Sequence, residues 1–221
     1  ELTLDQPVSS FFAQAFHDVT RKTISPVDTS LQPRDVPCSG IPGLAFSGGV
    51  DSSAAMSLLP HNAALVFLER CAPDNAQWSS MYDKSAPLGI CRYYQGIGRN
   101  VTVVSTDLEY LRHPTGFPVD LANGVPAILL AESLLLDSLA YGMILESAYR
   151  AGHEFYQDYA QRHHYRLWSR LFSAAGLPLN LVTAGVSEVG TSSIVMQELD
   201  DQHVQSCMRG KPGRPCFNCW K

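Results

Sequence analysis

Short apolar runs alternate along most of the chain with longer, helix-like segments. The helix-like segments are residues 52–59, 83–95, 125–136, 155–175 and 191–199, and the apolar runs are residues 44–46, 64–68, 101–104, 139–145 and 179–182. This alternation predicts an α/β fold in which helices cover both faces of a parallel sheet. Ligands of such sheets bind beyond the carboxyl ends of the strands, so we expect the functional residues at that edge.

Helix-breaking and capping residues mark several element ends. Pro60 stops the helix 52–59, Gly176 follows the segment 155–175, and Thr191 is expected to be the N-cap of the last helix. Near the N-terminus, residues 9–20 predict an amphipathic helix, and residues 25–43, rich in Pro, Ser and Asp, predict a loop. These signals divide the chain into three parts: an N-terminal appendage (1–41), a central domain (42–200) and a C-terminal tail (201–221).

The composition is that of a folded protein. Hydrophobic residues make up 45% of the 221 residues and charged residues 17%, which is apolar enough to build a core. The net charge of -5 argues against a protein that coats nucleic acid through general electrostatics. The most apolar stretch, 125–145, contains Glu132 and Asp137, so we expect no membrane span. We see no secretory signal, and a start at Glu1 rather than Met indicates that the natural start lies upstream.

The cysteines fall into a scattered group and a C-terminal cluster. Six cysteines in 221 residues are too few and too uneven for a secreted disulfide framework, so we expect a reducing, cytoplasmic setting. Among the scattered ones, Cys71 and Cys91 are expected to be thiols of the core rather than catalysts.

The junction between the first apolar run of the central domain and the helix after it has the composition of an anion site. Its sequence is Phe46-Ser47-Gly48-Gly49-Val50-Asp51-Ser52-Ser53. The two glycines let backbone N–H groups approach a ligand closely. The serines add hydroxyls at a helix start, where the helix dipole favours phosphate. The aspartate would repel a bare phosphate and therefore suits a helix cap or a magnesium ligand. A simple Gly-Gly turn before a capped helix is the less favoured alternative.

The segment from Ser47 to Ser53 resembles the PP-loop of the N-type ATP pyrophosphatases, whereas the P-loop, dinucleotide-binding and zinc-protease patterns are absent. The resemblance implies a Rossmann-like domain, similar to the adenine nucleotide alpha hydrolases, in which the loop holds ATP with Mg²⁺. A carboxylate or carbonyl oxygen would be adenylated with release of pyrophosphate, and a nucleophile such as ammonia or a sulfur donor would displace AMP. By this resemblance residues 46–53 bind ATP, and Asp51 and Ser53 serve catalysis.

The clustered cysteines have the spacing of metal ligands. Cys207, Cys216 and Cys219 form the pattern C-x8-C-x2-C, whose x2 pair places two thiolates on one ion. This pattern resembles the zinc-binding end of the 7-cyano-7-deazaguanine synthase family, C-x8-C-x2-C-x2-C, which implies Zn²⁺. A fourth cysteine of that pattern would lie just after Lys221, and His203 is an alternative ligand. An iron–sulfur cluster and free thiols are the less favoured alternatives to zinc.

Weaker signals lie further along the chain. Gly142 and Glu146 follow an apolar run, and the resemblance implies that this strand end faces ATP; a buried strand passing into a helix is an equal alternative. Glu188 stands where relatives often carry a basic residue, so we expect no pyrophosphate contact there. The positive charge would then come from the metal loop, although we favour a solvated role for its basic residues, Arg209, Lys211 and Arg214.

Three hypotheses about function follow. The favoured one is an ATP-dependent ligase or synthase that adenylates a small-molecule acceptor, deazapurine-like by the resemblance, and then amidates it or forms a nitrile with ammonia as donor. The second is a sulfur transferase acting on tRNA or a small molecule. The third is a nucleotide-binding module without turnover. A homodimer is common among the relatives. A tRNA partner is not favoured, and its support is a locally basic stretch: Arg150, His153, Arg162, Arg166 and Arg170.

Overall fold

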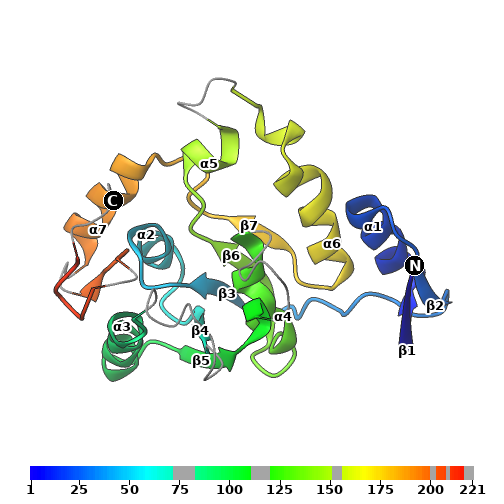
Figure 1. The fold of residues 1–221 in the computed structure, drawn as a ribbon, viewed down its shortest axis with the longest axis horizontal. Helices are drawn as coiled ribbons and strands as arrows, with labels where there is room; N and C mark the ends of the chain where they lie inside the picture. The colour runs from blue at the N-terminus through cyan, green and yellow to red at the C-terminus, as the bar shows by residue number, and fades with distance from the viewer. Residues whose placement is uncertain (72–82, 111–119, 151–155, 200–202, 208–209, 217–221) are drawn as a thin grey trace.

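A sheet of five parallel strands forms the centre of the molecule (Figure 1). The computed structural model describes the chain except for residues 72–82, 111–119, 151–155, 200–202, 208–209 and 217–221. In spatial order the strands are β5 (Val101–Thr106), β4 (Ala64–Arg70), β3 (Ile41–Phe46), β6 (Leu136–Tyr141) and β7 (Leu179–Leu181). The chain therefore builds outward from β3 to one edge and then returns to build the other half from β6. In open α/β sheets ligands bind at such a reversal, which lies here at the carboxyl ends of β3 and β6.

Helices cover both faces of this sheet, as the sequence predicts. Alternate strand residues divide between two hydrophobic clusters: Leu44 and Phe46 belong to one, and Ala45 belongs to the other. The first cluster includes residues of α2 (Val50–Leu58) and α3 (Ser85–Gly96), and the second includes residues of α4 (Val125–Leu129) and α6 (Ser169–Ala174). The α/β fold with a doubly covered parallel sheet is thus confirmed.

The other described helical segments after β3 are short except for α7 (Glu188–Glu198), which packs beside α2. The short segments are η2 (Leu108–Tyr110), η3 (Asp120–Gly124), α5 (Leu145–Tyr149), η4 (Tyr159–Gln161) and the π-helical η5 (His164–Trp168). Within the described residues, no helix combines the length and the apolar character needed to cross a bilayer.

The N-terminal residues form a small unit of their own beside α6 (Figure 1). In this unit β1 (Leu2–Ser9) and β2 (Ile24–Asp28) pair in parallel, and α1 (Ser10–Thr20) connects them. The Ser9 hydroxyl caps α1, which confirms the helix over residues 9–20. The loop predicted over residues 25–43 is wrong at both ends, because β2 and the start of β3 lie within it. Pairing with distant strands, which the local composition does not reveal, makes these segments extended.

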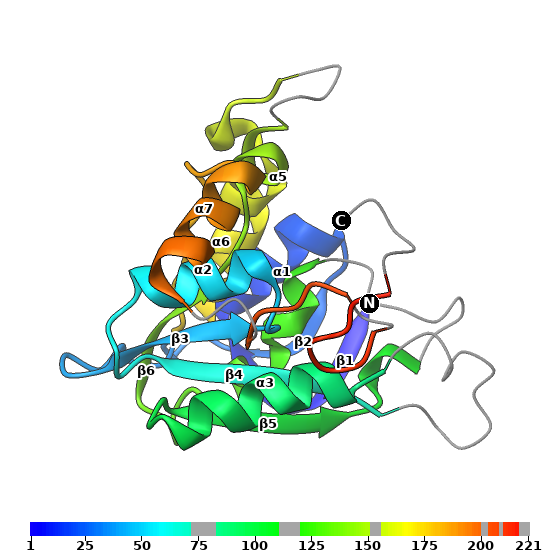
Figure 2. The same ribbon diagram turned by 90° about the vertical axis from the view of Figure 1, so that its left-hand side faces the viewer.

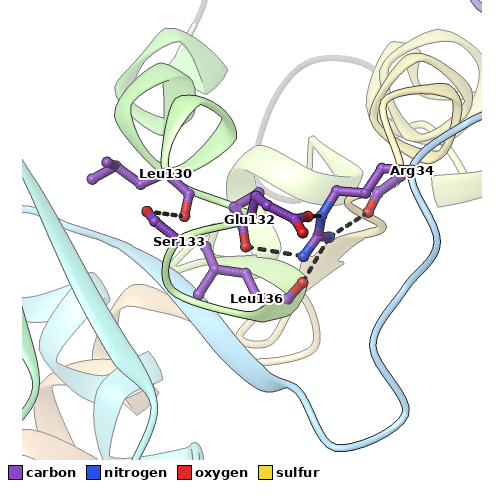
Figure 3. A network of polar contacts seen from close by, with 7 residues as sticks. Arg34, Leu130, Glu132, Ser133 and Leu136 are labelled. Atoms are coloured by element: carbon purple, nitrogen blue, oxygen red, sulfur yellow. Dashed lines mark hydrogen bonds and ion pairs between the residues drawn. The ribbon is translucent and has the colours of Figure 1, made fainter.

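Arg34 fastens the segment between β2 and β3 to the central domain (Figure 3). Its guanidinium donates to the carbonyl oxygens of Ala131 at 2.9 Å, Leu136 at 2.9 Å and Gly176 at 3.0 Å. It also forms an ion pair of 2.8 Å with the exposed Glu132. One cation thus joins the appendage to the turn before β6 and to the turn after α6.

Several predicted boundaries are wrong for identifiable reasons. The helix predicted over 125–136 ends with α4, and the strand predicted over 139–145 is β6, which starts earlier. Leu135, at a φ of 52°, forms a turn, and Leu136 then enters the sheet by pairing with Ile41 of β3. In the segment predicted as a helix over 155–175, the described residues form η4, η5 and α6 in succession.

The N-cap of α7 also lies four residues earlier than Thr191, because α7 starts at Glu188 and its cap is Ser187. The Ser187 hydroxyl caps it by accepting from the Gly190 N–H at 3.1 Å. Thr191 is therefore free for another role, inside the helix.

Candidate functional site

The segment 47–53, here called the 47–53 corner, turns from β3 into α2 at the carboxyl end of β3, where the strand order reverses. Gly48 has a φ of 75°, and Gly49 precedes the first residue of α2 without a side-chain cap. The Ser47 and Ser52 hydroxyls lie 2.9 Å apart, and Ser52 Oγ also accepts from the Ser47 N–H at 3.3 Å. The corner therefore has the strand–turn–helix geometry that suits an anion, with two hydroxyls linked to each other.

Asp51 is held by a residue from the far end of the domain. Its Oδ1 accepts a hydrogen bond of 2.8 Å from Thr191 Oγ1, and Thr191 is completely buried in α7. Residues 140 positions apart thus fix one carboxylate at the start of α2. Mg²⁺ prefers carboxylate and water ligands, so the donor set of this corner fits that ion.

Gly142 and Glu146 occupy supporting positions. A Cβ on Gly142 would lie 2.4 Å from Asp51 O, so the absence of a side chain there lets β6 approach the start of α2. Glu146 accepts from the Glu188 N–H at 3.2 Å (Oε2) and 3.3 Å (Oε1), which satisfies the N-terminus of α7. The predicted contacts of both residues with ATP stay predictions.

Three other predicted ATP ligands lie beneath the surface of the corner. Phe46, Ser52 and Ser53 are 2%, 6% and 0% exposed, respectively. Within the described residues Ser53 Oγ is buried and has no hydrogen-bond partner. The roles predicted for Ser53 and its neighbours stay predictions.

A cavity of about 940 Å³ opens on the corner. Val50 and Asp51 reach it from α2, and Glu188 and Ser192 reach it from α7. The opposite wall comes from α3 and the C-terminal tail, which pass close to each other (Figure 2). The tail residue His203 stacks on Tyr93 of α3 with ring centroids 3.4 Å apart. Sequence reasoning missed Tyr93, because its spacing on α3 does not differ from that of a core position.

The tail also bonds directly to the corner. Gln205 N donates to Gly48 O at 2.9 Å, and Val50 N donates to Ser206 Oγ at 3.2 Å. The first N–H of α2, which Gly49 cannot cap with a side chain, is thus capped by a serine 156 positions away. Sequence reasoning missed Gln205 and Ser206, and only their position directly before the first clustered cysteine could have drawn attention to them.

Cys207 and Cys216 lie together in the tail with their Sγ atoms 3.4 Å apart. Cys207 Sγ also accepts from the N–H groups of Gly210 and Cys216, each at 3.2 Å. Two thiolates about 2.3 Å from one tetrahedral ion would lie roughly 3.8 Å apart, whereas a disulfide would bring them to about 2.05 Å. The pair is therefore too far apart for a disulfide; its spacing is that of a thiol–thiol hydrogen bond and lies within about 0.4 Å of the spacing of two ligands on one metal ion.

The complete metal site remains a prediction. Cys219 lies outside the described residues, and within the described part no group of three or more His, Cys, Asp or Glu side chains is placed to hold a metal. His203, the alternative ligand, stacks on Tyr93 and does not complete such a group with Cys207 and Cys216.

The two predicted core thiols and the basic residues of the tail differ in how deeply they are buried. Cys91 is buried in the core, and burial raises the pKa of its thiol to about 12, so this predicted core thiol is no nucleophile. Cys71 is only partly buried. Lys211 and Arg214 are exposed, and Arg209 lies outside the described residues.

Part of the basic stretch is engaged within the chain. Arg162 donates to Gln157 Oε1 and to Ser147 O, and Arg170 pairs with Asp18 of α1 at 3.0 Å. His153 lies outside the described residues. These contacts explain two of the five basic residues without a nucleic-acid partner.

Comparisons with known proteins give limited matches. Residues 167–221 match a family of unknown function, DUF6395. No curated protein matches the sequence. Among solved structures, the chain is similar to the U34-tRNA thiolase NcsA from Methanococcus maripaludis, determined with its [4Fe-4S] cluster, with a TM-score of 0.47 and 14% identity. The similarity covers 79% of this chain and 62% of the thiolase chain. At this level of similarity the match supports no statement about the chemistry of this protein.

Proposed function

We propose that this protein is an ATP-dependent enzyme of the PP-loop type that adenylates a carboxylate or carbonyl oxygen of a small molecule and releases pyrophosphate. The observation that carries the proposal is the position of the 47–53 corner. The sequence Ser-Gly-Gly-Val-Asp-Ser-Ser lies at the carboxyl end of β3, where the strand order reverses, and beside a cavity of about 940 Å³. The five free cysteines of the described part suit a reducing, cytoplasmic setting.

The proposed chemistry assigns simple tasks to the chain. N–H groups at the start of α2 and the exposed hydroxyl of Ser47 bind negative charge that develops on the departing pyrophosphate. Bound Mg²⁺ would neutralise part of this charge. Asp51, oriented by its hydrogen bond from Thr191, would hold that ion. The cavity provides room for the acceptor beside the phosphates and holds the two reactants in contact.

A ligase and a sulfur transferase share this first step and differ in the nucleophile that displaces AMP. Ammonia as the nucleophile would give an amide or, after a second activation, a nitrile. Sulfur transfer is the second candidate because Cys207 lines the same cavity as Asp51. A thiol at that place lies where a sulfur donor for the adenylated intermediate would be needed.

The proposed adenylation is tested by ATP–pyrophosphate isotope exchange with a panel of carboxylic acids and nucleobase-like acceptors. We expect exchange with at least one acceptor and a loss of about 100-fold or more in Asp51→Asn, the size of effect seen when one group that stabilises transition-state charge is removed. The matched control is Asp35→Asn, which changes an exposed aspartate away from the corner. Failure of the wild type to bind Mg-ATP, or full exchange activity in Asp51→Asn, would refute the proposal.

Product formation by the Cys207→Ser variant separates the two candidates. For a ligase, product formation should need ammonia and survive Cys207→Ser in protein that remains folded. For a sulfur transferase, ATP–pyrophosphate exchange should survive Cys207→Ser while transfer of sulfur to the acceptor is lost.

A further inference from the structure

The C-terminal tail connects the cysteine pair to the 47–53 corner through two adjacent residues. Gln205 binds the corner with its backbone, through the 2.9 Å bond from its N–H to Gly48 O. With its side chain it binds the segment that carries the cysteines: Nε2 donates to Cys207 O at 3.1 Å and to Gly210 O at 3.4 Å, and Oε1 accepts from Gly213 N at 3.1 Å. We call this segment, residues 207 and 210–216, the cysteine turn.

Ser206 is the residue that this arrangement delivers to the corner. Its Oγ accepts from the Val50 N–H at 3.2 Å, and Gly49 permits this approach, because a Cβ there would lie 3.3 Å from Ser206 Oγ. A hydroxyl that accepts one hydrogen bond still has its own proton to donate. Ser206 lines the cavity together with Val50 and Asp51, so this proton can be directed to a ligand at the N-terminus of α2.

We propose that Ser206 is an additional residue of the phosphate-binding corner, and that the cysteine turn holds it there through Gln205. This inference rests on the proposed function, because it needs a phosphate group at the corner. It goes beyond that function in joining two sites: a metal ion on Cys207 and Cys216 and a phosphate on the corner stabilise each other. In this arrangement Ser206 contacts the phosphate and Gln205 is a positioning residue.

The physical basis is the ordering of the tail. A metal ion bound by the two thiolates fixes the cysteine turn, and the Gln205 side chain transmits that order to Ser206. A phosphate then binds a corner whose hydroxyl is already in place. Thermodynamic linkage requires the reverse effect to be equal, so ATP must raise the metal affinity by the same factor as the metal raises the ATP affinity.

The test compares the full chain with and without Zn²⁺, using two measurements. The dissociation constant of Mg-ATP is measured by calorimetry, and we expect Zn²⁺ to lower it by about 10-fold, within the usual range of coupling between sites. Hydrogen exchange of the Val50 amide is measured without nucleotide, and we expect Zn²⁺ to slow it, because Zn²⁺ fixes the serine that accepts from this N–H.

Variants separate the roles of the two tail residues. Ser206→Ala should weaken ATP binding about 10-fold and remove the effect of Zn²⁺ on Val50 exchange, whereas Ser206→Thr, which keeps the hydroxyl, should retain both. Gln205→Ala should leave Zn²⁺ binding intact and abolish its effect on the ATP dissociation constant. The matched controls are Ser193→Ala and Gln197→Ala on the exposed side of α7, which should behave as wild type.

The outcomes distinguish this inference from the proposed function. ATP binding that is equally tight with and without Zn²⁺ would overturn the inference and leave the proposed function standing. Unchanged ATP affinity in Ser206→Ala would do the same. If the wild type bound no ATP in either form, the proposed function itself would fail, and the role of Ser206 with it.

Discussion

Arg34 allows a quantitative test of how the N-terminal appendage is attached to the central domain. The variant is Arg34→Ala, which removes the guanidinium that bonds to three carbonyl oxygens and to Glu132 (Figure 3). The side chain is only 18% exposed, and the residues that carry the three carbonyls, Ala131, Leu136 and Gly176, are all buried. The carbonyl oxygens would therefore lose a charged donor at places that water reaches poorly.

The expected loss follows from these contacts. A hydrogen bond to a charged donor contributes about 1.5–3 kcal/mol, and three of them set an upper limit that partial rehydration and greater freedom of the released segment reduce. We expect the free energy of unfolding to fall by about 3–4 kcal/mol, equal to a drop of roughly 6–16 °C in Tm for a chain of this size. Glu132 is 85% exposed, so its ion pair contributes only about 0–1 kcal/mol.

The measurement is urea unfolding followed by circular dichroism, with Glu132→Ala as the matched control. Arg34→Lys should fall between the wild type and Arg34→Ala, because an ammonium keeps the charge and cannot reach three carbonyls with the same fork geometry. If Arg34→Ala and Glu132→Ala were equally stable within 1 kcal/mol, the carbonyl contacts would have no net value and the reasoning would be refuted.

Three further predictions concern the corner and the sheet. Thr191→Val should weaken Mg-ATP binding roughly 10-fold in calorimetry, because Asp51 loses the hydroxyl that orients it; unchanged affinity would show that this bond is irrelevant. Gly142→Ala should lower the free energy of unfolding by about 1–3 kcal/mol in urea, because a Cβ would lie 2.4 Å from Asp51 O, while Gly96→Ala, where nothing lies within 4 Å, should cost nothing. The Glu69 carboxyl accepts hydrogen bonds from Lys84, which has the larger effect, and from Ser105, and both hold its pKa below the ordinary value of 4.5. The contribution of the ionised Glu69 to stability is therefore complete above pH 4.5 and is lost as the pH falls through the lowered pKa. Thermal unfolding between pH 3 and 6 should show a shallower acid decline in Glu69→Gln than in wild type, and identical profiles would contradict this.

The proposed metal site and the proposed nucleotide site are close enough to act together. The tail that carries Cys207 and Cys216 forms one wall of the cavity and bonds to the corner on its way. A metal ion on this turn would therefore do more than stabilise the C-terminus. It would control how much of the phosphate site is in place when ATP arrives, which is why the proposed experiments measure both ligands on the same protein.

The sequence by itself predicts the parts of this protein that depend on neighbours in the chain. The alternation of apolar runs and helix-like segments indicates the covered parallel sheet. A strand buried on both faces must be apolar at successive positions, and the helices that cover those faces lie between the strands in the sequence. The Ser-Gly-Gly-Val-Asp-Ser-Ser segment is contiguous, so its chemistry is visible without a structure. The spacing of the clustered cysteines also predicts that they bind one metal ion, since a short loop brings their thiols close together.

Tertiary structure decides the features that join distant segments. β2 and the first residues of β3 have the composition of a loop and become strands only because β1, β4 and β6 supply partners. Thr191 has the features of a helix cap, yet the packing of α7 against α2 turns its hydroxyl to Asp51. Hydrogen bonds between residues 140 or more positions apart leave no local pattern, because their geometry depends on how whole elements pack. The chain thus encodes the 47–53 corner locally, while only the folded domain brings Thr191 and Ser206 to it.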